Sequence, residues 1–168
     1  MSNMERPRLI METIERNPGI RFSDIMKILK IKNGALKHHL DKLESKSVLR
    51  VERTPRVSRF YSLDISESEI QIAKNLRQET PRKIIQLLLK SEPINFTEIF
   101  KKIKKAPATT SFYATQLVED GVLIDTFENG KRFFSIIDRK TVISLISKYH
   151  PDLIERATDN FADIIASL

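Results

Sequence analysis

The chain contains an internal repeat with a period of 74 residues, and this repeat limits the folds that it can adopt. The segment PRLIMETIE at residue 7 matches PRKIIQLLL at 81, and FSDIMKILK at 22 matches FTEIFKKIK at 96. KLESKSVL at 42 matches QLVEDGVL at 116, and RFYSL at 59 matches RFFSI at 132 after a slip of one residue. About thirteen positions are identical over about sixty, which is long enough for each copy to close its own core. We therefore expect two tandem copies of one small domain and not a solenoid.

The segment 33–46, NGALKHHLDKLESK, is the clearest helix of the first copy. At 100° per residue, Leu36, Leu40 and Leu43 fall on one face, while His38 and Asp41 point the opposite way. A shorter helix at 23–30 precedes it, and two strand-like runs, 48–53 and 58–63, follow it around a turn at 54–56. The leucine stripe predicts that one face of 33–46 enters a core and that the opposite face meets a polar partner, and the order of helix, turn, helix and hairpin is that of a winged helix-turn-helix domain.

Short polar residues suggest where the other helices begin. Ser23 precedes an apolar helical pattern and is a predicted N-cap, and Thr97 takes the same place in the second copy. Thr80 is the predicted N-cap of the first helix of that copy. Ile20 and Phe22 form a minimal strand between the first two helices.

The pattern divides the chain into four parts. We predict a winged-helix domain over 1–65, a connecting helix over 66–80, a second winged-helix domain over 81–138 and a C-terminal helical extension over 139–168. The connecting segment opens with a capping-box spacing, Ser66 and Glu69, and contains no Gly or Pro. The predicted fold is mainly α with small β-wings, with two tandem winged helix-turn-helix domains followed by C-terminal helices.

Composition favours an anionic partner and excludes several kinds of site. The net charge is +7 and the pI about 9.7, and residues 1–65 carry 14 Lys and Arg against 8 Asp and Glu. The chain has no cysteine, which excludes disulfides and thiolate metal sites. No apolar run is long enough to span a membrane, and the first residues lack the apolar core of a signal peptide. We expect a soluble, cytoplasmic protein.

The run LKHHLDKLESKSVLRVE, followed by RFYSL, resembles the ArsR/MarR-like winged-helix transcription regulators. The matching features are His39-Leu40, Leu43, the apolar Val48-Leu49 and the aromatic end of the second strand, whereas Ser47 stands where the family pattern has glycine. The second copy restores that glycine as Gly121. The tandem arrangement resembles archaeal regulators with paired winged helices, which implies a DNA-binding function.

We predict the DNA contacts of the first copy from this geometry, because a helix fits the major groove and its margins reach phosphates. Four arginines around the wing tip can enter a minor groove or bind the backbone. His39 falls at the edge of the apolar stripe, so we expect it to pack or donate a hydrogen bond within the domain. The predicted contacts are Asn33, Ala35, Lys37 and His38 toward bases, Lys32 and Lys42 toward phosphates, and Arg50, Arg53, Arg56 and Arg59 in the wing.

The second copy differs at the corresponding surface. No Lys or Arg occurs between Lys105 and Lys131, and Phe112 occupies the position of His38. A basic group that is expected on the preceding helix, Lys101, Lys102, Lys104 and Lys105, could still hold phosphates. Phe112 suggests an apolar contact, either with thymine methyl groups or with another protein surface. We expect this domain to serve mainly in assembly or in weaker DNA contact. The predicted interface consists of Phe112 and an apolar stripe near the C-terminus formed by Ile154, Ala157, Phe161, Ile164 and Leu168.

The sequence gives little support for catalysis or for a cofactor. Adjacent helical residues diverge by about 100°, so His38 and His39 cannot readily bind one metal ion. No nucleophile–base pair, carboxylate dyad or glycine-rich phosphate loop is present, and the protein is not expected to be an enzyme.

The favoured interpretation is a sequence-specific regulator of transcription that binds double-stranded DNA as a homodimer. The alternative is a tandem winged-helix module that binds other proteins, as in chromosome segregation or transcription initiation. The operator sequence, the direction of regulation and any small-molecule effector are left open by the sequence.

Overall fold

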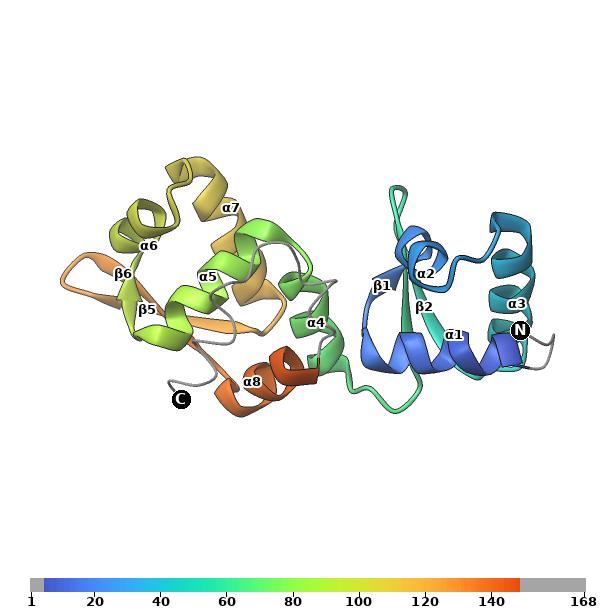
Figure 1. Cartoon of the computed structure of the whole chain (residues 1–168). Coiled ribbons are helices and arrows are strands. Elements are labelled where there is room, and N and C mark those ends of the chain that lie inside the picture. Colours follow the sequence, from blue (N-terminus) through green and yellow to red (C-terminus); the bar gives the residue numbers. More distant parts are fainter. Residues whose placement is uncertain (1–4, 149–168) are drawn as a thin grey trace. The chain divides into compact units, whose positions relative to one another are not determined.

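The computed structural model describes residues 5–148, which fall into two units that we treat separately (Figure 1). The first unit ends at Ser66, and the second comprises Glu67–Ser147. Both units share a series of three helices and a three-stranded antiparallel sheet in the same order, which confirms the predicted tandem winged helix-turn-helix fold.

In the first unit, the third strand lies between the other two. The elements are α1 (Glu5–Arg16), β1 (Ile20–Arg21), α2 (Phe22–Leu29), α3 (Asn33–Ser45), β2 (Leu49–Arg53) and β3 (Ser58–Ser62). Ile20 pairs with Phe60 on one edge of β3, and Val51 pairs with Phe60 on the other. The two residues of β1 thus tie the helical part of the unit to the hairpin.

The second unit repeats this plan and adds a helix at each end. Its elements are α4 (Glu67–Leu76), α5 (Glu79–Lys90), β4 (Ile94–Asn95), α6 (Phe96–Ile103), α7 (Pro107–Glu119), β5 (Leu123–Glu128), β6 (Lys131–Ile136) and α8 (Arg139–Lys148). The three repeated helices have 12, 8 and 13 residues in both units, and β6 lies between β4 and β5. Equal element lengths are the structural counterpart of the 74-residue period.

The core of the first unit forms around the apolar stripe of α3. Leu36, Leu40 and Leu43 are buried as predicted, and they join residues from α1, α2 and the sheet. Burying one leucine side chain stabilises a fold by about 1.5–3 kcal/mol. The buried cluster consists of Ile10, Ile14, Ile20, Ile25, Ile31, Leu36, Leu40, Leu43, Leu49 and Phe60.

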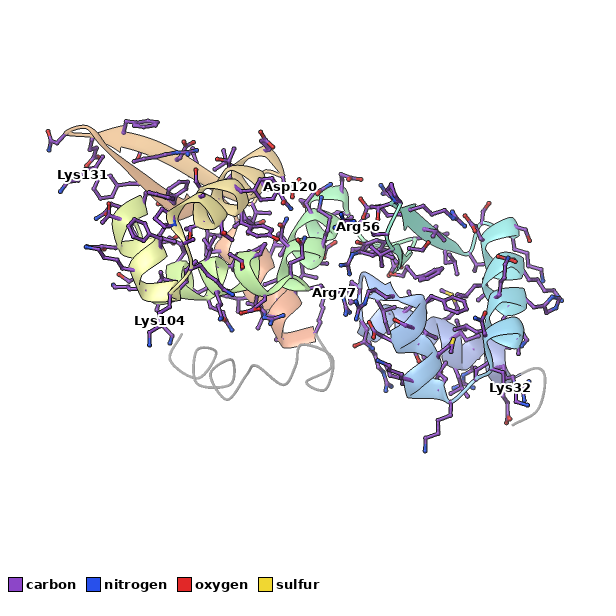
Figure 2. All side chains as sticks on the ribbon, turned by 90° about the horizontal axis from the view of Figure 1, so that it is seen from above. Lys32, Arg56, Arg77, Lys104, Asp120 and Lys131 are labelled. Atoms are coloured by element: carbon purple, nitrogen blue, oxygen red, sulfur yellow. The ribbon has the colours of Figure 1, made fainter. Side chains whose placement is uncertain are left out.

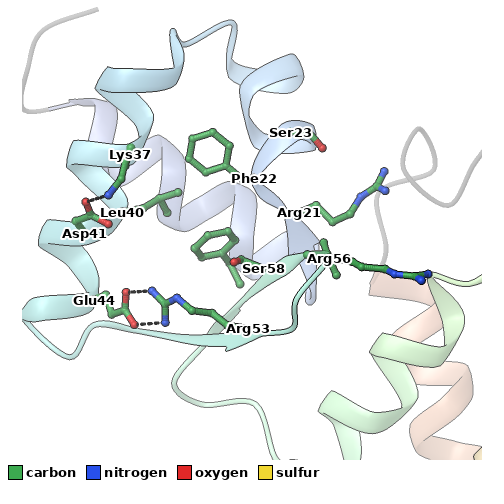
Figure 3. A pocket seen from close by; sticks show the side chains of 12 residues that line it. Arg21, Phe22, Ser23, Lys37, Leu40, Asp41, Glu44, Arg53, Arg56 and Ser58 are labelled. Atoms are coloured by element: carbon green, nitrogen blue, oxygen red, sulfur yellow. Dashed lines mark hydrogen bonds and ion pairs between the residues drawn. The ribbon is translucent and has the colours of Figure 1, made fainter.

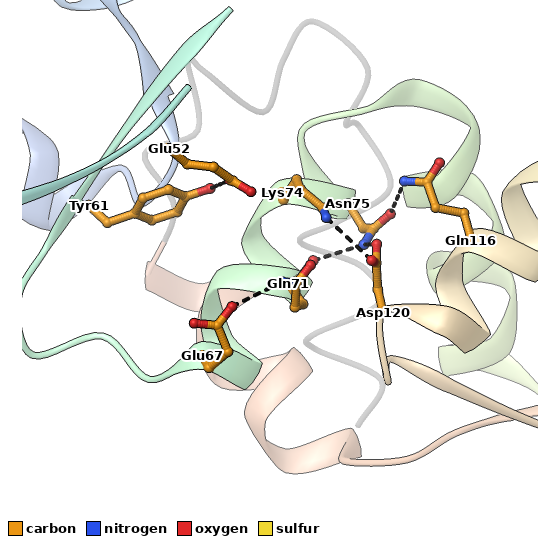
Figure 4. Close-up of polar contacts among 8 residues, drawn as sticks. All are labelled: Glu52, Tyr61, Glu67, Gln71, Lys74, Asn75, Gln116 and Asp120. Atoms are coloured by element: carbon orange, nitrogen blue, oxygen red, sulfur yellow. Dashed lines mark hydrogen bonds and ion pairs between the residues drawn. The ribbon is translucent and has the colours of Figure 1, made fainter. Parts of the chain in front are cut away.

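Helix α4 packs within the second unit, against α5 and the C-terminal end of α7. Its Asn75 is fully buried and donates to Asp120 Oδ2 at 2.8 Å, while Gln116 Nε2 donates to Asn75 Oδ1 at 3.3 Å (Figure 4). Lys74 adds an ion pair to Asp120 at 3.3 Å. Because a buried amide requires partners, this network fixes α4 on α7 in one position.

The predicted N-caps are wrong by about two residues. Helix α2 begins at Phe22 because β1 runs directly into it, so Arg21, whose side chain makes no capping bond, is the N-cap in place of Ser23. In the second unit Asn95, and not Thr97, caps α6 by accepting from Glu98 N at 3.0 Å. Thr80 is buried inside α5, whose N-cap is Gln78.

The turn after the third helix requires a left-handed backbone in both units. Ser47 has φ of 52° and Gly121 has φ of 71°, and nothing lies within 4 Å of a Cβ built at Gly121. A side chain at this position therefore costs backbone strain without a steric clash.

We predict that Ser47→Gly stabilises the first unit by about 0.5–1 kcal/mol, because it removes the strain of a left-handed L-residue. Gly121→Ser should destabilise the second unit by about the same amount. Calorimetric unfolding of the two variants and the wild type measures both changes. Equal melting temperatures in all three proteins would show that neither turn is strained.

Candidate nucleic-acid interface

Helix α3 presents an exposed polar face opposite its buried leucines. Lys32 precedes the helix as its N-cap, and Asn33 forms its first turn. Lys32, Asn33, Lys37, His38 and Lys42 are all exposed, which leaves five of the six predicted contacts near this helix open to a partner. The exception is Ala35, which is half-buried and packs against the core, so that its side chain faces inward.

His39 is buried, with 8% of its surface exposed, and this confirms the packing role predicted for it. Burial lowers the pKa of His39 from its usual 6.5, and the neighbouring charges of His38, Arg6 and Lys42 lower it further. The neutral imidazole is therefore the form that the fold favours. Its ring meets that of His38 edge to face, with centroids 5.7 Å apart.

A groove of about 510 Å³ runs between α3 and the β2–β3 hairpin of the first unit (Figure 3). Its floor is apolar, with Phe22, Leu40 and Phe60, and its rim carries charged and hydroxyl groups. The lining residues are Arg21, Phe22 and Ser23 from the β1–α2 junction, Lys37, Leu40, Asp41 and Glu44 from α3, and Arg53, Arg56, Val57, Ser58 and Phe60 from the hairpin.

Two ion pairs lie within this groove, both drawn in Figure 3. Lys37 Nζ is 2.6 Å from Asp41 Oδ2, one turn further along α3. Arg53 donates two hydrogen bonds to Glu44, at 2.7 and 2.5 Å, and so joins the hairpin to α3. The bonds from Arg53 lower the pKa of Glu44. All four side chains remain at least one-third exposed to solvent.

The wing arginines have different surroundings. Arg50 and Arg56 are exposed, and the structure gives Arg56 no ion pair with any residue between 5 and 148. Arg59 is half-buried and donates to Gly19 O at 2.9 Å, so it holds β3 to the turn that ends α1. This bond gives Arg59 a structural role that the spacing of the arginines did not suggest.

The tertiary structure adds residues that the sequence analysis did not select. Arg21, Ser23 and Ser58 line the groove beside the predicted contacts, and so do the carboxylates of Asp41 and Glu44. Only the β1–β3 pairing brings residue 21 close to the hairpin, and Arg21 directly faces Arg59 in that ladder. No local sequence signal could have grouped these residues.

The second unit has exposed cations on α6 and on its own hairpin, among other positions. Lys101 and Lys104 are exposed, and Figure 2 shows Lys104 at the end of α6 and Lys131 on the hairpin. Lys105 is half-buried and pairs with Glu79 at 3.1 Å. Together with Lys83, it lowers the pKa of Glu79 to about 2, chiefly through hydrogen bonds.

Exposed phenyl rings replace the charged groups of the first unit. Phe112, in the position of His38, is 65% exposed. Its ring lies edge to face with that of Tyr113, with centroids 5.1 Å apart. Phe127, at the position of Arg53, is 72% exposed. The second unit thus lacks the cations that line the α3 groove and offers apolar surface instead.

Residues 5–148 can also be searched for membrane-spanning helices and for metal sites. No helix in this range is long and apolar enough to cross a membrane, and no three His, Asp or Glu side chains in it come together as a metal site would require. The predicted C-terminal interface residues lie outside the described range, namely Ile154, Ala157, Phe161, Ile164 and Leu168.

Comparisons with known proteins give one family match, which covers the first unit and the beginning of α4. Residues 4–72 match the family HTH_HVO_0163_N, described as an N-terminal HTH domain. No curated protein sequence matches the chain. Among solved structures, HlyU from Vibrio cholerae N16961 is similar at 15% sequence identity and a TM-score of 0.43, over 46% of this chain and 84% of HlyU.

We predict that acid destabilises the first unit through His39. Because its pKa is lowered in the fold, the unfolded chain binds the proton more readily, and stability falls as the pH drops below 6.5. His39→Gln should therefore lose less stability than the wild type between neutral pH and about pH 5. Urea unfolding of the wild type and the variant at several pH values measures this. An equal loss in wild type and His39→Gln would contradict the prediction.

Proposed function

We propose that the protein is a sequence-specific, double-stranded DNA-binding regulator of transcription, because residues 4–72 match a family of N-terminal helix-turn-helix domains. The observation that carries the proposal is the exposed polar face of α3, which stands beside a basic hairpin in the same unit. A helix-turn-helix family points to a binding protein and not to an enzyme.

In the proposed complex, α3 enters the major groove with Asn33, Lys37 and His38 toward base edges. Lys32 and Lys42 at its margins bind phosphates. The wing arginines, Arg56 foremost, contact the adjacent backbone or minor groove. The groove between α3 and the hairpin is the space through which the intervening sugar-phosphate strand passes, beside Arg21 and Ser23.

A second candidate function is a tandem winged-helix module that binds protein. The exposure of Phe112 and Phe127 favours it for the second unit, together with the absence of Lys and Arg between Lys105 and Lys131. A gel shift with random duplex DNA separates the two candidates, because only the first requires the intact chain to bind DNA at low salt.

We further propose that the protein is a homodimer, assembled through the second unit and the C-terminal residues. Light scattering at micromolar concentration should give twice the chain mass of 19.5 kDa. Phe112→Ser should shift the mass toward a single chain, because it removes apolar contact area. A wild-type mass of one chain would refute the dimer.

For DNA binding, we predict that Lys42→Ala and Arg56→Ala each weaken affinity for random and selected duplexes alike. Each lost phosphate contact should make the log–log salt dependence of affinity shallower by about 0.9. Arg16→Ala and Lys90→Ala change the charge equally at exposed positions away from the groove and serve as controls. Fluorescence anisotropy over a salt series measures the slopes. Unchanged affinity in the Lys42 and Arg56 variants would contradict the proposed surface.

A further inference from the structure

The cations that line the α3 groove are mostly matched by carboxylates within the same unit. Arg21 pairs with Asp24 at 2.9 Å, in addition to the pairs of Lys37 with Asp41 and Arg53 with Glu44. Of the four lining cations, only Arg56 has no ion pair within residues 5–148. The number of basic residues in this region therefore overstates how many are available to phosphates.

Two of these carboxylates, Asp41 and Glu44, line the groove themselves. The side chain of Asp41 is 57% exposed and that of Glu44 is 36% exposed, so each would face a sugar-phosphate strand that entered. A carboxylate that is not neutralised by a cation repels a nearby phosphate. Lys37 and Arg53 therefore have to release Asp41 and Glu44 before they can neutralise a phosphate. Binding of the backbone thus requires an exchange of partners.

We infer that Asp41 and Glu44 restrain sequence-independent binding of duplex DNA by holding Lys37 and Arg53 in the free protein. This inference rests on the proposed function. The occupant of the groove in this sequence-independent mode is the phosphodiester backbone, whose phosphates replace the two carboxylates as partners of the cations. Lys37 then binds a phosphate in place of the base edge proposed for it in the sequence-specific complex. Affinity for DNA then depends more on base contacts of α3 and less on charge than the composition suggests.

The exchange has a measurable consequence for salt dependence. A cation that binds a phosphate normally releases a condensed counterion, which contributes about −0.9 to the log–log slope. A carboxylate freed in the same step attracts a salt cation from solution, which offsets that release. Each ion pair in the groove therefore contributes little to the slope until its carboxylate is removed.

The second unit offers an internal comparison. At the offset of 74, Ser111 and Thr115 replace Lys37 and Asp41, and Val118 and Phe127 replace Glu44 and Arg53. The second unit thus lacks both the cation and the carboxylate of each pair, so the two charges of a pair are present together in the first unit and absent together in the second. The second unit therefore lacks the two ion pairs that form this restraint in the α3 groove.

The test uses Asp41→Asn and Glu44→Gln in the full chain, with random-sequence duplex as the probe. Each variant should bind about fivefold more tightly near 100 mM salt, and its slope should steepen by up to about 0.9. Glu12→Gln is the matched control, because it removes the exposed Arg8–Glu12 pair of α1 with the same change in charge. It should bind less than twofold more tightly. Thermal unfolding confirms that all variants are folded.

Three results would overturn the inference. Weaker binding by Glu44→Gln would show that the Glu44–Arg53 pair positions the hairpin for DNA. Unchanged affinity and slope, with a wild type that binds duplex, would show that the pairs lie outside the interface and would leave the proposed function intact. A wild type that binds no duplex at low salt would end the proposed function and this inference together.

Discussion

The burial of one face of α3 is the interaction on which the rest of the first unit depends. Leu36, Leu40 and Leu43 can enter the core only if the helix is rotated so that His38 and Asp41 face solvent. The hydrophobic effect therefore decides the orientation of the polar face without any contribution from a partner. Because the same core holds β1 and the hairpin through Ile20 and Phe60, the groove beside α3 is a consequence of this packing.

The two units show how one fold can carry different surfaces. Their helices have equal lengths and their sheets the same strand order, because the apolar positions are retained across the repeat. The outward positions are not under this constraint. His38 corresponds to Phe112 and Arg53 to Phe127, which changes the chemistry of the face while the backbone stays the same. A shared fold thus says little about whether both units have the same partner.

Charge in the first unit is organised more closely than its total indicates. The sequence shows a surplus of Lys and Arg over residues 1–65, whereas the structure shows that several of these side chains have intramolecular partners. Arg59 donates to the backbone of Gly19, and Arg53 joins the hairpin to α3 through Glu44. Exposed ion pairs contribute little to stability, usually less than about 1 kcal/mol, so their main effect is on which cations a ligand can reach.

The sequence alone determined the tandem fold, the leucine stripe of α3 and the inward position of His39, because helical periodicity depends only on residue spacing. It also contains the two-residue turn Asn129-Gly130, whose φ values of 48° and 73° suit a tight hairpin. The tertiary structure decided where α2 and α5 begin, since β1 and the core fix their first turns. It also decided the partners of Arg53 and Arg59, because Glu44 and Gly19 lie 9 and 40 positions away from them in the chain and meet them only after the sheet has formed.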